Sequence, residues 1–236
     1  MRKKLLLLLI VLLAAVLAIV AWQLLFPAPT VLSEQGDYGP SPELVEPHQT
    51  LVPVLRPAKA VGWPAGEMPS PAMGLQVNAF VSGLDHPRWL YVLPNGDVLV
   101  AESNAPEGSG LCSDFKNFAA GVVLDFSGAR TPSADRITLH RDTDGDGAAD
   151  ESHVFAEGLH SPFGMTLIDG HLYIANADAL LRFSYLPGQT TLTESPELIA
   201  KLPSGRNHHW TKNILPTPDK RGLFITVGSN SNVGEC

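Results

Sequence analysis

Three segments of this chain resemble one another, and this repetition constrains the fold more than any other feature of the sequence. Each segment has a polar loop, a short apolar stretch, a tight turn rich in Asn, Asp and Gly, and a strongly apolar second stretch. The segments are residues 83–103, 158–177 and 207–230. Repetition at a spacing of tens of residues is typical of repeat architectures, and a β-hairpin unit indicates a β-propeller. A propeller presents the loops before such hairpins on one face, so these loops are candidate site positions.

Short apolar stretches alternate with turns from about residue 75 onward, and we predict a strand at each stretch. The predicted strands are Trp89–Leu93, Asp97–Ala101, Val122–Phe126, Ile137–His140, Val154–Ala156, Met165–Ile168, His171–Ala175, Leu180–Tyr185, Leu198–Leu202, Ile214–Leu215 and Leu223–Val227. No window beyond the N-terminal segment shows a convincing helical period, so the globular part is predicted to be all-β.

The spacing of the repeats predicts how many blades the chain contains. The repeats begin 75 residues apart (Gly83 to Gly158) and then 49 apart (Gly158 to Asn207), which brackets one four-stranded blade, with an inserted loop in the longer spacing. Residues 76–236 therefore provide about three blades, whereas propellers use four to eight and close to remove exposed edges. We expect an incomplete, N-terminal portion of a propeller, from a longer protein or a truncated gene. A three-bladed unit that dimerises is the alternative.

The N-terminus carries an apolar segment, Leu5–Phe26, which is broken only by Gln23 and preceded by three basic residues. At helical rise, such a segment spans the hydrocarbon core of a bilayer, and its basic flank favours a cytoplasmic N-terminus. A cleaved signal peptide is the alternative, although neither candidate cleavage site fits well. The sequence thus predicts a transmembrane helix over residues 1–26, which would anchor the chain in the inner (cytoplasmic) membrane with the globular part in the periplasm or outside.

Residues 27–75 are rich in proline and show little periodicity, which predicts an extended tether. The formal net charge is −8 at pH 7, with no basic stripe, so a nucleic-acid partner is not expected. Cys112 and Cys236 are the only cysteines and give no disulfide framework. The chain has no CxxC, P-loop or GxGxxG motif, so the sequence gives no support for a zinc ribbon, an NTPase or a Rossmann domain.

An acidic loop, Asp142–Asp150, has carboxylates at Asp142, Asp144, Asp146 and Asp150 around two glycines. Oxygen ligands at alternate positions of a glycine-containing turn suit Ca²⁺. The position of the bidentate Glu of an EF-hand is occupied by His153, so the loop more closely resembles the DxDGDG loops of extracellular β-proteins. We predict a structural Ca²⁺ site, with a bare Asp/Gly turn as the alternative.

The loop of the third repeat, residues 206–213, concentrates polar and titratable groups, including His208 and His209. Histidine suits general base catalysis near neutral pH. A metal site or an ordinary solvated loop are the alternatives. Since His86 and His160 lie in the corresponding loops of the other repeats, part of the role of a loop histidine is interpreted as architectural. Packing roles are predicted for the three recurring aromatic residues Trp89, Phe163 and Trp210.

Several motifs together resemble the sorbosone dehydrogenase family, the pyrroloquinoline quinone (PQQ)-dependent glucose/sorbosone dehydrogenases, which are six-bladed propellers. The resemblance covers about residues 78–236 and is carried by residues 141–147, 163–165, 172–176, 209–213, 218–220 and 224–232. It implies that His209 takes a proton from a sugar hydroxyl while hydride passes to the quinone. It also suggests Lys212 and Asn232 as cofactor contacts.

The chain departs from the family pattern at two places. His208 stands where the soluble glucose dehydrogenases have an acidic residue, and the Arg-Asn pair that follows the next strand is not reproduced at Asn232 and Val233. In members of the family, the Ca²⁺ site against the quinone and most cationic cofactor contacts lie beyond the part that corresponds to these 236 residues. We therefore expect the 236 residues alone to be inactive.

These features favour one function over two alternatives. The first is a membrane-anchored, periplasmic quinoprotein that oxidises a sugar or a related alcohol or aldehyde with PQQ, which would supply the redox chemistry. The second is a tethered, non-catalytic propeller that binds glycans or envelope proteins. The third, a sugar-lactone hydrolase, would need a central metal held by carboxylates from several blades, and the sequence shows no such set.

Overall fold

The computed structural model describes residues 2–25, 40–42, 58–64, 66–110, 114–206 and 208–231, and the chain divides into two compact units, Met1–Ala58 and Lys59–Cys236. In the first unit, the apolar N-terminal segment forms the helix α1, Arg2–Leu25. Within the described part of the chain, no helix has both the length and the hydropathy that a membrane span requires. Much of the predicted tether, and both cysteines, lie outside the described residues.

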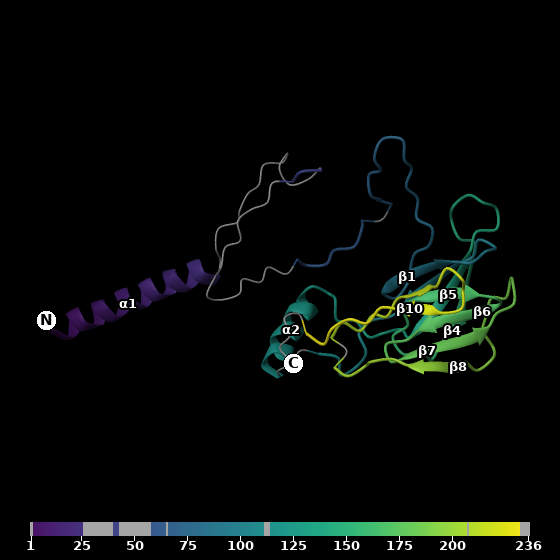
Figure 1. Ribbon diagram of the computed structural model, residues 1–236. Coiled ribbons are helices and arrows are strands. Elements are labelled where there is room, and N and C mark those ends of the chain that lie inside the picture. Colours follow the sequence, from purple (N-terminus) through teal and green to yellow (C-terminus); the bar gives the residue numbers. More distant parts are fainter. Residues whose placement is uncertain are drawn as a thin grey trace. The chain divides into compact units, whose positions relative to one another are not determined.

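The second unit is built from antiparallel sheets in which each strand pairs with its neighbour in sequence (Figure 1). The first sheet contains β1 (Pro87–Val92), β2 (Val98–Glu102), β3 (Arg136–Arg141) and β4 (Glu151–Ala156). The second contains β5 (Met165–Ile168), β6 (His171–Ala175), β7 (Ala179–Ser184) and β8 (Glu197–Lys201). A third, two-stranded sheet contains β9 (Ile214–Pro216) and β10 (Leu223–Ile225). This arrangement is consistent with a partial propeller-like fold.

All but one of the predicted strands are present, with ends within three residues of the prediction. The exception is Val122–Phe126, which forms the end of the helix α2, Asp114–Phe126. The all-β prediction is therefore wrong for the insertion between β2 and β3. Phe118, Val122 and Phe126 recur every fourth residue, so they share one face of a helix, and the alanines between them favour that conformation. The predicted strand, Val122–Phe126, excludes Phe118 and is too short to show this helical period.

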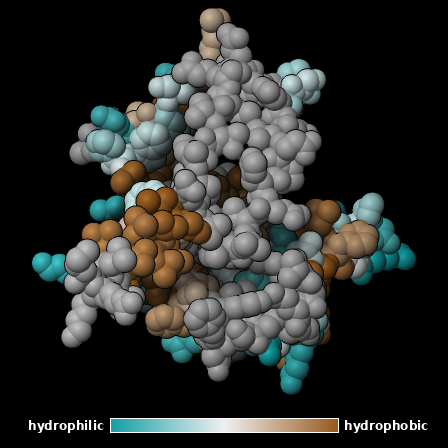
Figure 2. Space-filling model, turned by 90° about the vertical axis from the view of Figure 1, so that its left-hand side faces the viewer, coloured by the Kyte–Doolittle hydropathy of each residue, from teal (hydrophilic) through white to brown (hydrophobic). Residues whose placement is uncertain are grey.

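Apolar side chains also remain at the surface of both units, and exposed hydrophobic residues are visible in Figure 2. In the first unit, they line α1 from Leu8 to Trp22. In the second unit, the same stripe of α2 is exposed, with Phe118 at 72% and Phe126 at 57% of full accessibility. The apolar stripe of α2 is not buried against the sheets, so such burial does not explain why this segment is helical.

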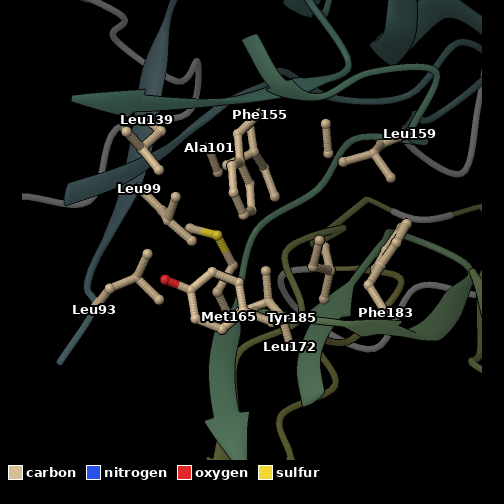
Figure 3. Close-up of a cluster of buried hydrophobic side chains, with 13 residues drawn as sticks. Leu93, Leu99, Ala101, Leu139, Phe155, Leu159, Met165, Leu172, Phe183 and Tyr185 are labelled. Carbon is tan, nitrogen blue, oxygen red and sulfur yellow. The ribbon is translucent and has the colours of Figure 1, made fainter. Parts of the chain in front are cut away.

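The second sheet contributes to two separate hydrophobic cores, one on each of its faces. In β6, Leu172 and Ile174 belong to a core shared with the first sheet, whereas Ala175 and Tyr173 belong to a core shared with the third sheet. Alternation of side chains along a strand sends these two pairs to opposite faces. Figure 3 shows the larger core, in which Met165 lies among side chains from both sheets. Both faces of β6 are thus covered, which explains the mostly apolar sequence of this strand.

A series of aromatic contacts joins the three sheets near the loops that precede them. The ring centroids of Trp89 and Phe163 are 5.0 Å apart, and Phe163 meets Trp210 edge to face at 6.1 Å. The predicted packing roles of these three residues are confirmed. Next to this series, a Cβ at Gly164 would lie 2.7 Å from the backbone nitrogen of Ile214. Only glycine allows the second and third sheets to approach so closely.

Charged and polar groups are buried in the first sheet as one hydrogen-bonded network. Glu102, which is fully buried, accepts hydrogen bonds from Arg136 and from the Thr138 hydroxyl at 2.8 Å each. Because Thr138 donates to Glu102, it accepts from Nε2 of His140, while Nδ1 lies 2.8 Å from the Ser152 hydroxyl. Burial favours the neutral form of this ring, in which Ser152 donates to Nδ1. Burying such groups is tolerated only when all of them have partners.

This network predicts that the protein loses stability in acid. Burial lowers the pKa of His140 below its ordinary value of 6.5, so below that pH the unfolded chain binds a proton that the folded chain does not. Burial alone would raise the pKa of Glu102, but the hydrogen bonds from Arg136, the Asp85 backbone and Thr138 outweigh it, so the pKa lies below 4.5. Glu102 therefore adds a second loss of stability below that value. The melting temperature measured from pH 8 to pH 4 is expected to fall from about pH 6.5 downward.

The matched variants are His140→Gln and His171→Gln, the latter changing the partly buried histidine at the start of β6, whose Nδ1 lies 3.1 Å from the Asp169 carbonyl oxygen. His140→Gln should flatten the profile between about pH 6.5 and pH 5, because it removes the titrating group. A His140→Gln profile that parallels the parent would contradict the assignment, and His171→Gln is expected to give that parallel profile.

Candidate functional site

The loops before β1 and β9 each carry a histidine that makes the same hydrogen bond. Nδ1 of His86 lies 2.9 Å from the carbonyl oxygen of Ser103, and Nδ1 of His209 lies 2.7 Å from that of Ser229. In both cases the acceptor follows the second strand of the hairpin, so the ring ties the loop to the end of that strand. This shared bond supports the architectural interpretation of the loop histidines.

The same hydrogen bond sets the chemistry of His209. A carbonyl oxygen only accepts, so Nδ1 carries the proton, and the neutral ring has its lone pair on Nε2. The residue is exposed, so a ligand can reach this nitrogen. The ring of His208 lies beside it, with the two centroids 4.5 Å apart. The position of an acidic neighbour is thus taken by a second imidazole, and the Ser229 carbonyl orients His209 instead.

Gly228 packs directly behind His209 and was not identified from the sequence. A Cβ on Gly228 would collide with Cβ of His209 and lie 2.6 Å from its carbonyl oxygen. The backbone of Gly228 does not adopt a positive φ, so this contact alone requires glycine here. The signal in the sequence is Val227-Gly228-Ser229, a glycine directly after an apolar strand and before the hydrogen-bond acceptor of the histidine.

Lys212, predicted as a cofactor contact, is buried at 1% exposure. Its Nζ donates to the carbonyl oxygen of Trp210 at 3.0 Å. Burial lowers the pKa of Lys212, and the negative charge of Asp178 acts in the opposite direction. Asn232, the other predicted contact, lies outside the described residues. The structure therefore places this cation of the histidine loop in the interior.

The acidic loop brings together three of its four predicted ligands. One carboxylate oxygen from each of Asp142, Asp144 and Asp146 lies within 4.8 Å of the others. The oxygens of Asp142 accept hydrogen bonds from the backbone nitrogens of Gly147 at 2.9 Å and Gly145 at 2.7 Å, which lower its pKa. Three carboxylates so close together could hold a cation with oxygen ligands.

Asp150 lies outside that group of three. Its carboxylate accepts from the Thr143 hydroxyl at 2.6 Å and from the Thr143 backbone nitrogen at 2.7 Å. These bonds, the hydroxyl bond first, lower the pKa of Asp150. The loop is also attached to the segment before β1, because Asn78 donates to the carbonyl oxygen of Gly147 at 2.6 Å. Asp150 therefore acts as the closing residue of the turn.

A pocket of about 910 Å³ lies among the loops that precede the strands and the insertion between β2 and β3. Its walls include residues from the loop regions of all three repeats: His86, Arg88, His160, Ser161 and Trp210. His86 and Ser161 occupy corresponding positions before a proline, and both have a positive φ, 53° and 45°. The repeat thus extends to an uncommon backbone conformation in the walls of the pocket. The sequence did not reveal that the loops of the three repeats meet around one pocket.

Comparisons with known proteins give one family and several distant structures. A family model described as "Domain of unknown function (DUF7133)" matches residues 114–235, just over half of the chain. No curated protein matches. Among solved structures, the PQQ domain of a pyranose dehydrogenase from Coprinopsis cinerea is 18% identical over 65% of this chain and 30% of that chain, with a TM-score of 0.46.

A Trichoderma reesei structure described under Carbohydrate-Active Enzymes Family AA12 is 15% identical over 68% of this chain and 34% of that chain, with a TM-score of 0.46. A calcium structure described in the same terms is 14% identical over 65% and 32%, with a TM-score of 0.43. The chain spans about a third of the length of these solved structures.

The packing of Gly228 against His209 predicts the effect of adding one methyl group. Gly228→Ala should displace the His209 loop and break the bond from Nδ1 to Ser229, because the added carbon has no room. The measurement is the ring chemical shifts of His209 in a histidine-labelled sample. Gly205→Ala is the control, since its Cβ would meet Asn230 at an ordinary 3.5 Å. Unchanged His209 shifts in Gly228→Ala would contradict the packing.

Proposed function

We propose that this chain, which belongs to the DUF7133 family, is part of a quinoprotein oxidoreductase that oxidises a sugar, or a related alcohol or aldehyde, with PQQ. The observation that carries the proposal is the geometry of His209, a neutral imidazole with Nδ1 fixed by Ser229 and Nε2 open to a ligand. It stands in the third repeat, where the sequence resembles the sorbosone dehydrogenases. A general base needs both an available lone pair and access to the proton that it removes.

In the proposed reaction, Nε2 of His209 accepts the proton of a substrate hydroxyl as the carbinol carbon becomes a carbonyl. PQQ, when bound, would supply the acceptor for the hydride that leaves that carbon. The ring then carries a positive charge, which the hydrogen bond from Nδ1 to the Ser229 carbonyl stabilises. Gly228 keeps the ring at a fixed position, so the proton acceptor does not need to reorganise during the reaction.

Two groups of the histidine loop would suit a quinone with carboxylate groups in charge and in proton chemistry. His209 offers the proton acceptor. Lys212 offers a cation whose pKa is lowered by burial, and a carboxylate beside it would favour the charged form. Lys212 and Asn232 are the residues of this chain that we propose would hold the cofactor. The basic residues before the apolar segment 5–26 favour a periplasmic location for this chemistry.

A structural Ca²⁺ ion at the acidic loop is a second part of the proposal. Asp142, Asp144 and Asp146 would supply its carboxylate ligands, and Asp150 would close the turn. Three negative charges within a few ångströms repel one another, and a divalent cation removes that repulsion. The ion would stabilise the connection between β3 and β4 and take no part in the oxidation.

The catalytic proposal predicts opposite results for the two adjacent histidines. In the full-length protein reconstituted with PQQ and Ca²⁺, His209→Gln should lower the rate of dye reduction with aldoses or sorbosone-like substrates by about 10²- to 10⁴-fold. His208→Gln is the matched control and should retain most of the rate. Quinone absorbance that remains after desalting reports binding separately, and both variants should keep it.

Full activity in His209→Gln would refute the site assignment alone. A parent protein that neither retains the quinone nor reduces the dye would refute the oxidoreductase function, and would favour a propeller that binds glycans or envelope proteins.

The calcium proposal predicts a change of stability on removal of the ion. Chelation with EGTA should lower the melting temperature by several degrees in the parent protein, and added Ca²⁺ should restore it. Asp144→Asn should abolish this response, because it removes one of the three clustered carboxylates. Asp169→Asn, in a turn of the second sheet, is the control that should keep the response. An identical melting temperature with and without EGTA would identify the loop as a bare turn.

A further inference from the structure

The pocket contains a guanidinium group that no carboxylate of the described part of the chain neutralises. The Arg88 guanidinium carbon lies 5.5 Å from the centroid of the Trp210 ring, and this stacking contact is its one side-chain interaction within the described ranges. Arg130 lines the same pocket but pairs with Asp125 at 3.5 Å. A guanidinium stacked on an aromatic ring keeps the N–H groups at its edge available, and these groups match the geometry of a carboxylate. Arg88 is thus prepared for an anionic group.

Groups that suit hydroxyls surround this cation. Nδ1 of His160 lies 3.0 Å from Asp178, and Nδ1 of His86 donates to the Ser103 carbonyl, so the neutral form of each ring has its lone pair on Nε2. Ser161 is 1% exposed, and its hydroxyl has no hydrogen-bond partner in the described structure. A buried hydroxyl without a partner is costly, and a ligand that supplies one would remove that cost.

The acidic residues of the pocket wall do not compete for this cation. Asp135 already accepts hydrogen bonds from the backbone nitrogen of Ser161 at 2.8 Å and from the Ser133 hydroxyl. Glu107 also lines the pocket, without any interaction with Arg88. Within the described residues, the wall therefore offers one arginine without a carboxylate partner and several hydrogen-bonding groups, with Glu107 as a remaining acidic side chain. The arginine and these groups favour a ligand with one anion and several hydroxyls.

We propose that this pocket binds a carboxylate-bearing sugar, a hexuronate or an aldonate. The carboxylate pairs with Arg88, and the hydroxyls meet His86, His160 and Ser161. The volume of about 910 Å³ accommodates one or two sugar units. The inference goes beyond the oxidoreductase proposal, because binding here requires neither His209 nor PQQ, and it adds an acidic class of ligand.

Isothermal titration of the full chain with glucuronate, glucose and acetate, in the absence of PQQ, tests this inference. Glucuronate should bind at least about tenfold more tightly than glucose or acetate, since only it engages both the cation and the hydroxyl partners. Arg88→Gln should remove the preference over glucose by weakening glucuronate about tenfold or more, and leave glucose unchanged. Asp178→Asn should weaken both sugars, because it releases the orientation of His160.

Arg130→Gln is the matched control, because it removes the other arginine of the pocket, which already pairs with Asp125. The preference for glucuronate should survive in it, with an unchanged melting temperature. Equal affinity for glucuronate and glucose, no binding of either, or a preference that persists in Arg88→Gln would overturn the proposal. Acetate as strong as glucuronate would reduce the pocket to an anion site, and displacement of glucuronate by PQQ would assign Arg88 to the cofactor; either result also overturns it. Because PQQ-dependent dye reduction is a separate measurement, failure here leaves the oxidoreductase proposal standing.

Discussion

Burial of both faces of the second sheet is the constraint on which the rest of the globular unit depends. Leu172 and Ile174 need the first sheet as a cover, and Tyr173 and Ala175 need the third, because neighbours on a strand point to opposite faces. The three sheets therefore pack face to face, and Gly164 permits the closest approach. The loops before β1, β5 and β9 then lie on one side of the stack, where Trp89, Phe163 and Trp210 make contact. The pocket is a consequence of this stacking.

The strands could be predicted from the sequence because their signals are local. Alternating or continuous apolar stretches between Gly, Asn and Asp turns give the strands of both complete sheets almost residue by residue. The helix α2 could not be found in the same way. Val122–Phe126 has the composition of a strand, and its helical period becomes visible only when Phe118 is included. Since the apolar face of α2 stays exposed, the pattern of burial that normally reveals a helix is also missing.

Only part of the candidate site could be predicted, and the division has a physical reason. The acidic loop and the histidine pair are runs of neighbouring residues, so composition reveals them. The partners that determine their chemistry are distant in sequence: Ser229 for His209, Asp178 for His160, and Trp210 for Arg88. Neighbouring positions also separate on folding, since Lys212 is buried while His209, three residues before it, is exposed. Such partners follow from the packing of the sheets, which no local pattern encodes.

The loop histidines show how a repeated structural device becomes a chemical one. In each repeat the acceptor beyond the second strand holds Nδ1 of a loop histidine: Ser103 for His86, Asp178 for His160 and Ser229 for His209. The ring thereby fastens the loop, and the same bond fixes the tautomer with its lone pair on Nε2. The fold thus supplies three imidazoles whose Nδ1 meets an acceptor, and their surroundings distinguish them. His86 and His160 face a pocket with an unneutralised arginine, whereas His209 is open to solvent above Gly228. Ligand recognition and proton transfer can therefore be divided among repeats that share one architecture.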